Sequence, residues 1–145
     1  RVFDRILADV PCTCEGTARK SGGLHFKPID SKFRAELAVR QRRILIRALE
    51  LVKVGGVVVY STCTFAPEEN EAVLTDALTR FGSYKVLFEK IELPAVRFSP
   101  GLQQWNGQEF LPGIEAAARI YPHQNDSGGF FVAVLRRIEG SGRPS

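Results

Sequence analysis

Residues 57–64 read Val-Val-Val-Tyr-Ser-Thr-Cys-Thr, a short β-branched run that ends in hydroxyls and a thiol. A similar arrangement occurs earlier, where the apolar residues 6–8 lead into Asp9-Val10-Pro11-Cys12. Short apolar runs of this kind are typical of buried strands in a parallel sheet. Ligands of open α/β sheets bind just outside the carboxyl ends of such strands. The two stretches therefore predict an α/β fold that brings Cys12 and Cys63 to one edge of the sheet.

The rest of the chain alternates between helix and strand patterns, which favours parallel strands joined by crossover helices. Two further features complete the predicted fold: Gly55-Gly56 ends the first helix, and the turn 123–129 joins the last two strands into an antiparallel hairpin at the sheet's edge. We predict strands over 2–10, 57–60, 84–93, 118–121 and 130–135, a helix from an N-cap at Ser31 to about Lys53, and a helix from Pro67 to about Arg80.

Size and composition indicate one modest globular domain. The chain has 145 residues, of which 44% are hydrophobic and 25% charged. We assign residues 1–138 to the domain and 139–145 to a flexible tail. No run approaches the ~18 apolar residues that a membrane span requires. The chain has three cysteines, an odd number without the spacing typical of disulfide-rich domains. This argues against a disulfide scaffold and favours a reducing, intracellular compartment.

The basic charge is compatible with a nucleic-acid partner. The net charge is +4, and arginines outnumber lysines 14 to 6. Guanidinium groups bind phosphates in a bidentate fork and stack on bases, which suits nucleic-acid binding. Ordinary surface arginines explain the charge equally well.

We call the two stretches that contain Cys12 and Cys63, residues 6–12 and 57–64, the two cassettes. Each cassette alone allows a plainer interpretation. Cys63 lies between a strand and an expected helix N-terminus, where the helix potential and amide donors would lower a thiol pKa. A small buried cysteine at a strand end is the alternative. Asp9 ends a buried strand and needs a partner, and it could simply cap loop amides.

Together, the cassettes resemble the Sun-type (Nop/Sun) family of RNA cytosine-5 methyltransferases. Both cassettes in this order, separated by one helix, form a specific pattern, whereas each alone is weak. The resemblance implies the second half of a Rossmann-like S-adenosylmethionine-dependent methyltransferase domain, with the glycine-rich first half preceding residue 1. The matching stretches are 4–12 (DRILADVPC), 15–20 (EGTARK), 55–64 (GGVVVYSTCT), 67–73 (PEENEAV), 119–123 (RIYPH) and 129–133 (GFFVA).

The resemblance also implies roles for three side chains. Cys63 would attack carbon 6 of cytosine, so that carbon 5 can accept the methyl group. Asp9 would bind and protonate the ring at N3 and lie near the methionine end of the cofactor. Cys12 would act as the base or assist product release. In DNA cytosine methyltransferases the Pro-Cys thiol itself attacks, so the second cassette favours RNA.

The expected substrate is a cytosine of ribosomal or transfer RNA, in the cytoplasm or, in a eukaryote, the nucleus or nucleolus. Carbon 5 of a cytosine cannot be reached while the base is stacked in an RNA helix, so the base must be flipped out or single-stranded. Basic side chains near the thiols are candidates for phosphate contacts, with a solvated basic surface as the alternative for each: Arg19, Lys20, His25, Lys27 and Arg40.

Two departures from the family pattern qualify this interpretation. Thr13-Cys14 follows Pro-Cys where the family usually has a small residue and then a glycine, small or acidic residue, and we assign Cys14 no role. Cys-x-Cys with one distant cysteine matches no standard structural zinc spacing, so the sequence predicts no metal site. The first strand would also lie at an open edge until the missing half of the domain pairs with it. The rival function is a catalytically silent RNA-binding or scaffold fragment.

Overall fold

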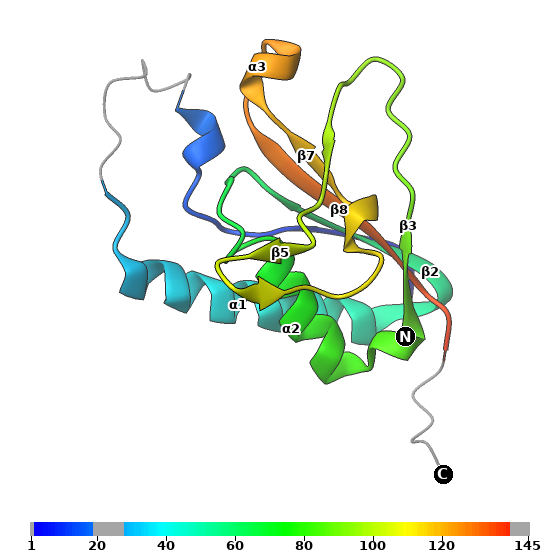
Figure 1. Cartoon of the computed structure of the whole chain (residues 1–145). Coiled ribbons are helices and arrows are strands. Elements are labelled where there is room, and N and C mark those ends of the chain that lie inside the picture. Colours follow the sequence, from blue (N-terminus) through cyan, green and yellow to red (C-terminus); the bar gives the residue numbers. More distant parts are fainter. Residues whose placement is uncertain (1, 19–27, 140–145) are drawn as a thin grey trace.

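A computed structural model of the protein describes residues 2–18 and 28–139. These residues form a sheet in the order β1-β2-β8-β7-β4, with β3 also paired to β8 (Figure 1). A separate two-stranded ribbon lies outside this sheet. The elements are β1 (Phe3–Asp9), α1 (Ser31–Leu51), β2 (Val52–Thr62), α2 (Glu71–Phe81), β3 (Val86–Glu89), β4 (Ser99–Pro100), β5 (Gln104–Trp105), β6 (Gln108–Glu109), β7 (Ala118–Ile120), α3 (Pro122–Asn125) and β8 (Phe130–Arg137).

The α/β fold is confirmed, but the sheet is mixed rather than mainly parallel. β1 and β2 pair in parallel, with α1 as the crossover between them. β8 pairs antiparallel with β2, β3 and β7. The predicted hairpin of β7 and β8 therefore exists, but its placement at the edge is wrong. β8 lies inside the sheet, and among the described strands β1 forms one edge of it.

Several predicted boundaries are also wrong. α1 ends at Leu51 and β2 begins at Val52, so Gly55-Gly56 lie within the strand instead of ending the helix. The pairing register shifts at this point, and Gly55 has a φ of 84°, a backbone conformation that favours glycine. α2 begins at Glu71, after a turn that contains Pro67. The N-cap of α1 is Asp30, whose carboxylate accepts a hydrogen bond from a backbone amide of the first turn.

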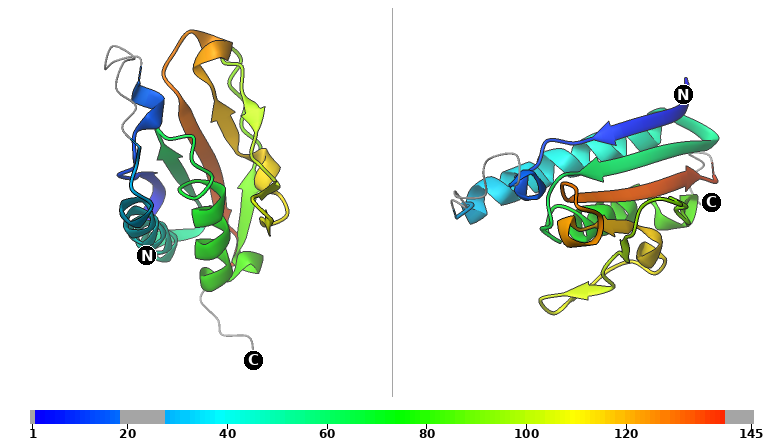
Figure 2. Two further views of the ribbon diagram at one scale, coloured as in Figure 1. Left: turned by 60° about the vertical axis from the view of Figure 1, so that its left-hand side comes forward. Right: turned by 90° about the horizontal axis from the view of Figure 1, so that it is seen from above.

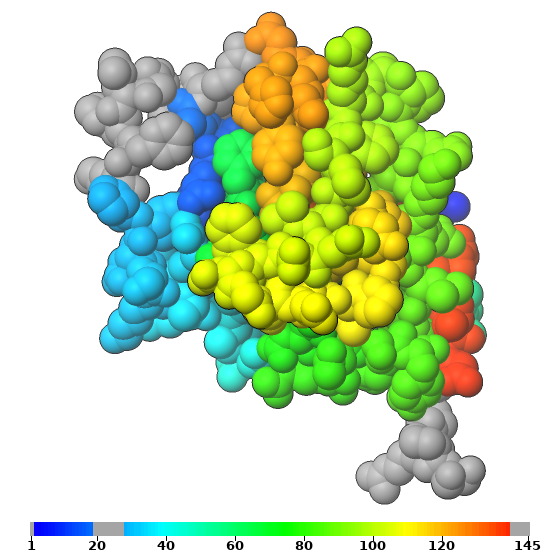
Figure 3. Space-filling model, viewed as in Figure 1, coloured from blue at the N-terminus to red at the C-terminus, as the bar shows by residue number. Residues whose placement is uncertain are grey.

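The core lies between the sheet and the two long helices. α1 and α2 pack side by side (Figure 2), and their apolar faces bury Leu45, Leu49 and Leu74 against Val58 and Phe131 of the sheet. The segment that carries β5 and β6 covers part of the face seen in Figure 3. Among the described residues, no helix is both long and apolar enough to cross a membrane.

Candidate active site

The structure brings the thiols of the two cassettes into contact. The Sγ atoms of Cys12 and Cys63 lie 3.3 Å apart, and the backbone N–H of Cys63 donates to the Cys12 sulfur at 3.4 Å. This proximity follows from the topology, because each cysteine lies just beyond the carboxyl end of one of two adjacent parallel strands. Within that pair, Asp9 of β1 is aligned with Ser61 of β2.

Asp9 lies at the same edge of the sheet. Its side chain is exposed, and its Oδ1 accepts a hydrogen bond of 2.8 Å from the Ser61 hydroxyl. The expectation that Asp9 ends a buried strand and so needs a partner is wrong, because most side chains of β1 are exposed in the part of the chain that the structure describes. The alternative in which Asp9 caps the following loop amides has no support among the described contacts.

Cys14 joins the same cluster. Its sulfur lies 3.8 Å from that of Cys12, and all three sulfurs lie within 4.8 Å of one another. Cys14 is exposed and has a φ of 60°, in the left-handed region that favours glycine. The chain thus carries three thiols where the proposed chemistry requires two.

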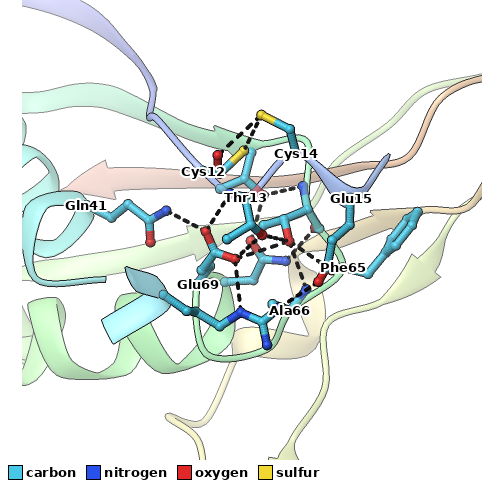
Figure 4. Close-up of polar contacts among 12 residues, drawn as sticks. Cys12, Thr13, Cys14, Glu15, Gln41, Phe65, Ala66 and Glu69 are labelled. Atoms are coloured by element: carbon cyan, nitrogen blue, oxygen red, sulfur yellow. Dashed lines mark hydrogen bonds and ion pairs between the residues drawn. The ribbon is translucent and has the colours of Figure 1, made fainter. Parts of the chain in front are cut away.

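A buried carboxylate, not anticipated from the sequence, holds the two cassettes together (Figure 4). Glu69 is fully buried and accepts hydrogen bonds from the backbone N–H and hydroxyl of Thr13, at 3.0 and 2.6 Å. It also accepts from the Thr64 hydroxyl at 3.2 Å and from the Gln41 amide of α1 at 3.1 Å. Because Thr13 follows Cys12 and Thr64 follows Cys63, one carboxylate fixes both loops.

Basic and amide groups complete this network from α1. Arg34 forms an ion pair with Glu15 at 2.6 Å and lies 3.7 Å from a carboxylate oxygen of Glu69. The Gln41 amide that contacts Glu69 also donates to the carbonyl of Pro11 at 2.7 Å. Helix α1 therefore holds the loop that carries Cys12 in place.

A glycine contact joins the same loops by their backbones. The N–H of Gly16 donates to the carbonyl of Cys63 at 2.7 Å, and the carbonyl of Gly16 accepts from the N–H of Gly129 at 2.9 Å. A Cβ atom at Gly16 would lie only 2.3 Å from the carbonyl oxygen of Gly129. A residue larger than glycine would therefore force the loops apart.

A buried ion pair lies behind the thiol loop. Arg119 of β7 donates from Nε to Glu71 at 2.7 Å and from Nη1 to the carbonyl of Phe65 at 3.0 Å. Glu71 also accepts from the N–H of Leu102 at 2.8 Å. For this stretch the sequence predicted only a helix that begins at Pro67. The structure gives Glu69 and Glu71 separate buried partners.

The expected lowering of the Cys63 pKa is wrong. Burial raises the pKa of Cys63 well above its ordinary value of 9.0, and the neighbouring sulfurs of Cys12 and Cys14 raise it further. Burial also raises the pKa of Cys12, although its hydrogen bonds with Cys63 act in the opposite direction. The helix that was expected to lower the Cys63 pKa begins only at Glu71. Both thiols are therefore protonated at neutral pH in the free protein.

The raised pKa values predict slow alkylation. Since only thiolates react, iodoacetamide should modify Cys12 and Cys63 more slowly at pH 7 than in the urea-unfolded protein. The rate should keep rising as the pH passes 9.0, the ordinary thiol pKa. Peptide mass mapping of each cysteine measures this. A rate that levels off below about pH 8 would contradict the raised values.

The candidate RNA contacts are only partly described. Arg19, Lys20, His25 and Lys27 lie outside the described residues, as does most of the predicted tail, residues 140–145. Arg40 is described and lies exposed on α1. Its neighbour is Gln41, which contacts the Pro11 and Glu69 oxygens beside the thiols.

Comparison with known proteins identifies related chains. The chain is 41% identical to the multisite-specific tRNA:(cytosine-C(5))-methyltransferase trm4b of Schizosaccharomyces pombe, over 94% of this chain and 24% of that protein. It is 33% identical to the 25S rRNA (cytosine-C(5))-methyltransferase nop2 of the same organism, over 94% and 22%. The chain thus spans about a quarter of the length of these curated relatives.

Solved structures share the fold. A methyltransferase homologue protein from Pyrococcus horikoshii matches with a TM-score of 0.73 and 37% identity, over 94% of this chain and 40% of that chain. The structure of NSun6 from the same organism, determined with SFG, matches with a TM-score of 0.71 and 30% identity, over 92% and 30%. Residues 1–136 match the family model described as 16S rRNA methyltransferase RsmB/F. The resemblance found in the sequence is confirmed, and the chain belongs to the 16S rRNA methyltransferase RsmB/F family.

Proposed function

We propose that this chain is the C-terminal part of the catalytic domain of an S-adenosylmethionine-dependent RNA cytosine-5 methyltransferase. The observation that carries the proposal is the 3.3 Å contact between the Cys12 and Cys63 sulfurs at the end of two parallel strands, with Asp9 at the same edge. The names of the two curated relatives above describe enzymes that methylate carbon 5 of cytosine in tRNA or rRNA. This chain offers two adjacent thiols, those of Cys12 and Cys63, for that chemistry.

In this proposal Cys63 is the nucleophile. Its sulfur bonds to carbon 6 of cytosine as the S–H bond breaks. The proton balance is closed because N3 of the ring gains one proton, relayed through the Asp9 carboxylate, for the one that Cys63 loses. Carbon 5 then becomes nucleophilic enough to accept a methyl group. Because burial raises the pKa of Cys63, attack by this sulfur must include removal of its proton.

Cys12 is suited to the second half of the reaction. After methylation the carbon 5 proton must leave, and the bond between the Cys63 sulfur and carbon 6 must break. The Cys12 sulfur accepts a hydrogen bond from the N–H of Cys63, which partly offsets the rise in the Cys12 pKa that burial causes and stabilises the thiolate once its proton has left. We therefore assign Cys12 as the base, or as a group that assists release.

The cofactor, when bound, supplies an electrophilic methyl group. The donor set described here fits one end of it, because the exposed Asp9 carboxylate can bind an ammonium group such as that of methionine. No glycine cluster in the sequence has the G-x-G-x-x-G spacing of a nucleotide-binding turn. We propose that the preceding half of the domain supplies the remaining cofactor contacts.

The open edge of β1 is the proposed docking surface for that half. Among the described residues, β1 pairs only with β2, and the side chains of Val2, Phe3 and Leu7 are exposed. An apolar groove between β1 and α1 includes Ile6 and Ile44. Pairing with a further strand would cover this surface.

The RNA is the proposed macromolecular partner. A flipped or single-stranded cytosine would reach the thiols, and basic side chains would bind the flanking phosphates. The proposed phosphate contacts are Arg19, Lys20, His25, Lys27 and Arg40.

A Cys12→Ala variant separates attack from release. Tested with the preceding half of the domain present, it should form a covalent protein–RNA adduct that persists, because Cys63 still attacks but release is impaired. The adduct is seen as a slow-migrating band on a denaturing gel. Filter binding of RNA with neither adduct nor methyl transfer in the unmodified protein would instead favour the silent RNA-binding fragment.

A further inference from the structure

We propose that Cys12, Cys14 and Cys63 form a three-thiolate site for a thiophilic d10 cation, represented by Zn²⁺. The third thiol, Cys14, is the one member of the cluster that methyl transfer does not use. The sequence spacing argues against such a site, but the structure brings the sulfurs together from separate loops.

The sulfur spacing suits zinc. With a zinc–sulfur bond of about 2.3 Å, two sulfurs of a tetrahedral site lie about 3.8 Å apart. Cys12 and Cys14 are separated by 3.8 Å, Cys12 and Cys63 by 3.3 Å, and the remaining pair by no more than 4.8 Å. Zinc would require the Cys12 and Cys63 sulfurs to move slightly apart and the Cys14 side chain to rotate, and solvent can provide the fourth ligand.

The backbone holds Cys14 in this position. A φ of 60° is unfavourable for a residue with a Cβ atom, yet Cys14 adopts it. Its sulfur donates to the carbonyl of Cys12 at 3.2 Å. Thr13, between the two cysteines, is fixed through its N–H and hydroxyl by the buried Glu69. The Cys-x-Cys turn is therefore organised before any cation arrives.

The electrostatics also favour a cation. Among the described residues, no lysine, arginine or histidine side chain forms a hydrogen bond with any of the three sulfurs, so no positive side chain competes with a cation there. Thiols that coordinate a metal lose their protons, so binding releases protons. The balanced reaction is one Zn²⁺ exchanging for up to three thiol protons, without oxidation or reduction.

Loading the site would block the thiols reversibly, a consequence that rests on the proposed methyltransferase function. Binding itself does not depend on that function. The reduced protein is titrated with Zn²⁺ under anaerobic conditions, in competition with a chromophoric chelator, while proton release is followed in weak buffer. We expect one tight equivalent and the release of two to three protons.

Cys14→Ser is the matched variant, because it removes one sulfur and leaves the two proposed catalytic thiols. It should bind Zn²⁺ at least about 100-fold more weakly, since even partners that only orient a metal ligand contribute 10–100-fold. It should retain methyl transfer and lose the inhibition by Zn²⁺. Titration of the unmodified protein with Cd²⁺ should show a cadmium–thiolate absorption band, which gives a readout that needs no variant.

Weak or non-stoichiometric binding by the unmodified protein, or equal affinity in Cys14→Ser, would overturn the proposal. Absence of the cadmium–thiolate band would also overturn it. Zinc binding in a protein that transfers no methyl group even with the preceding half of the domain present would support the metal site while counting against the proposed function. The two hypotheses thus fail separately.

Discussion

Cys63→Ala should lose methyl transfer by at least about 10⁴-fold, the scale seen when an enzyme loses its nucleophile. No other group can form the bond to carbon 6 if the assignment is correct, so the covalent RNA adduct should vanish as well. The measurement is methyl incorporation into RNA, with the preceding half of the domain present. Folding of the variant is checked by circular dichroism.

Cys14→Ser is the control for Cys63→Ala, because it removes a neighbouring thiol of the same cluster and should leave transfer nearly unchanged. An adduct that still forms in Cys63→Ala would reassign attack to Cys12. The 3.3 Å separation of the two sulfurs makes that exchange of roles the natural competing mechanism.

Arg119→Met should destabilise the protein by about 3–5 kcal/mol, because it leaves the fully buried Glu71 carboxylate without its ionic partner. It also leaves the carbonyl of Phe65 without the donor that binds it. Urea denaturation followed by circular dichroism measures the change. The midpoint should shift while the slope of the transition is retained.

Two controls distinguish loss of the pair from loss of an arginine. Arg47→Met removes the same group from an exposed pair with Glu50 and should cost at most about 1 kcal/mol. In the double variant Arg119→Met/Glu71→Leu, part of the lost stability should return, because the unpaired Glu71 charge is removed as well. Equal effects of Arg119→Met and Arg47→Met would show that the buried pair contributes no more than a surface one.

The sequence predicted the fold class, the parallel β1–β2 pair and the meeting of Cys12 with Cys63. These depend on local apolar runs and on the rule that parallel neighbours end at the same edge. The placement of β8 could not be predicted in this way, because strand pairing across the whole chain leaves no local pattern. Gly55-Gly56 was misread as a helix stop because glycines also mark irregular points within strands.

The supporting network of the site was also out of reach from sequence. Glu69 lies in the stretch predicted as a helix from Pro67, and that local pattern does not indicate its hydrogen bonds to Thr13, Gln41 and Thr64 from three separate segments. The raised pKa of Cys63 could not be predicted for the same reason. It depends on burial and on the sulfurs of Cys12 and Cys14, which lie far from Cys63 in the sequence.

The interior position of β8 has a consequence for biosynthesis. This strand is the last of the described elements to leave the ribosome, yet it joins β2 to both β3 and β7. Arg137 at its end also donates to the carbonyls of Leu49 and Val52, where α1 meets β2. A premature stop codon even shortly before residue 130 would therefore leave the β1–β2 pair, the β4–β7 pair and β3 without the strand that joins them.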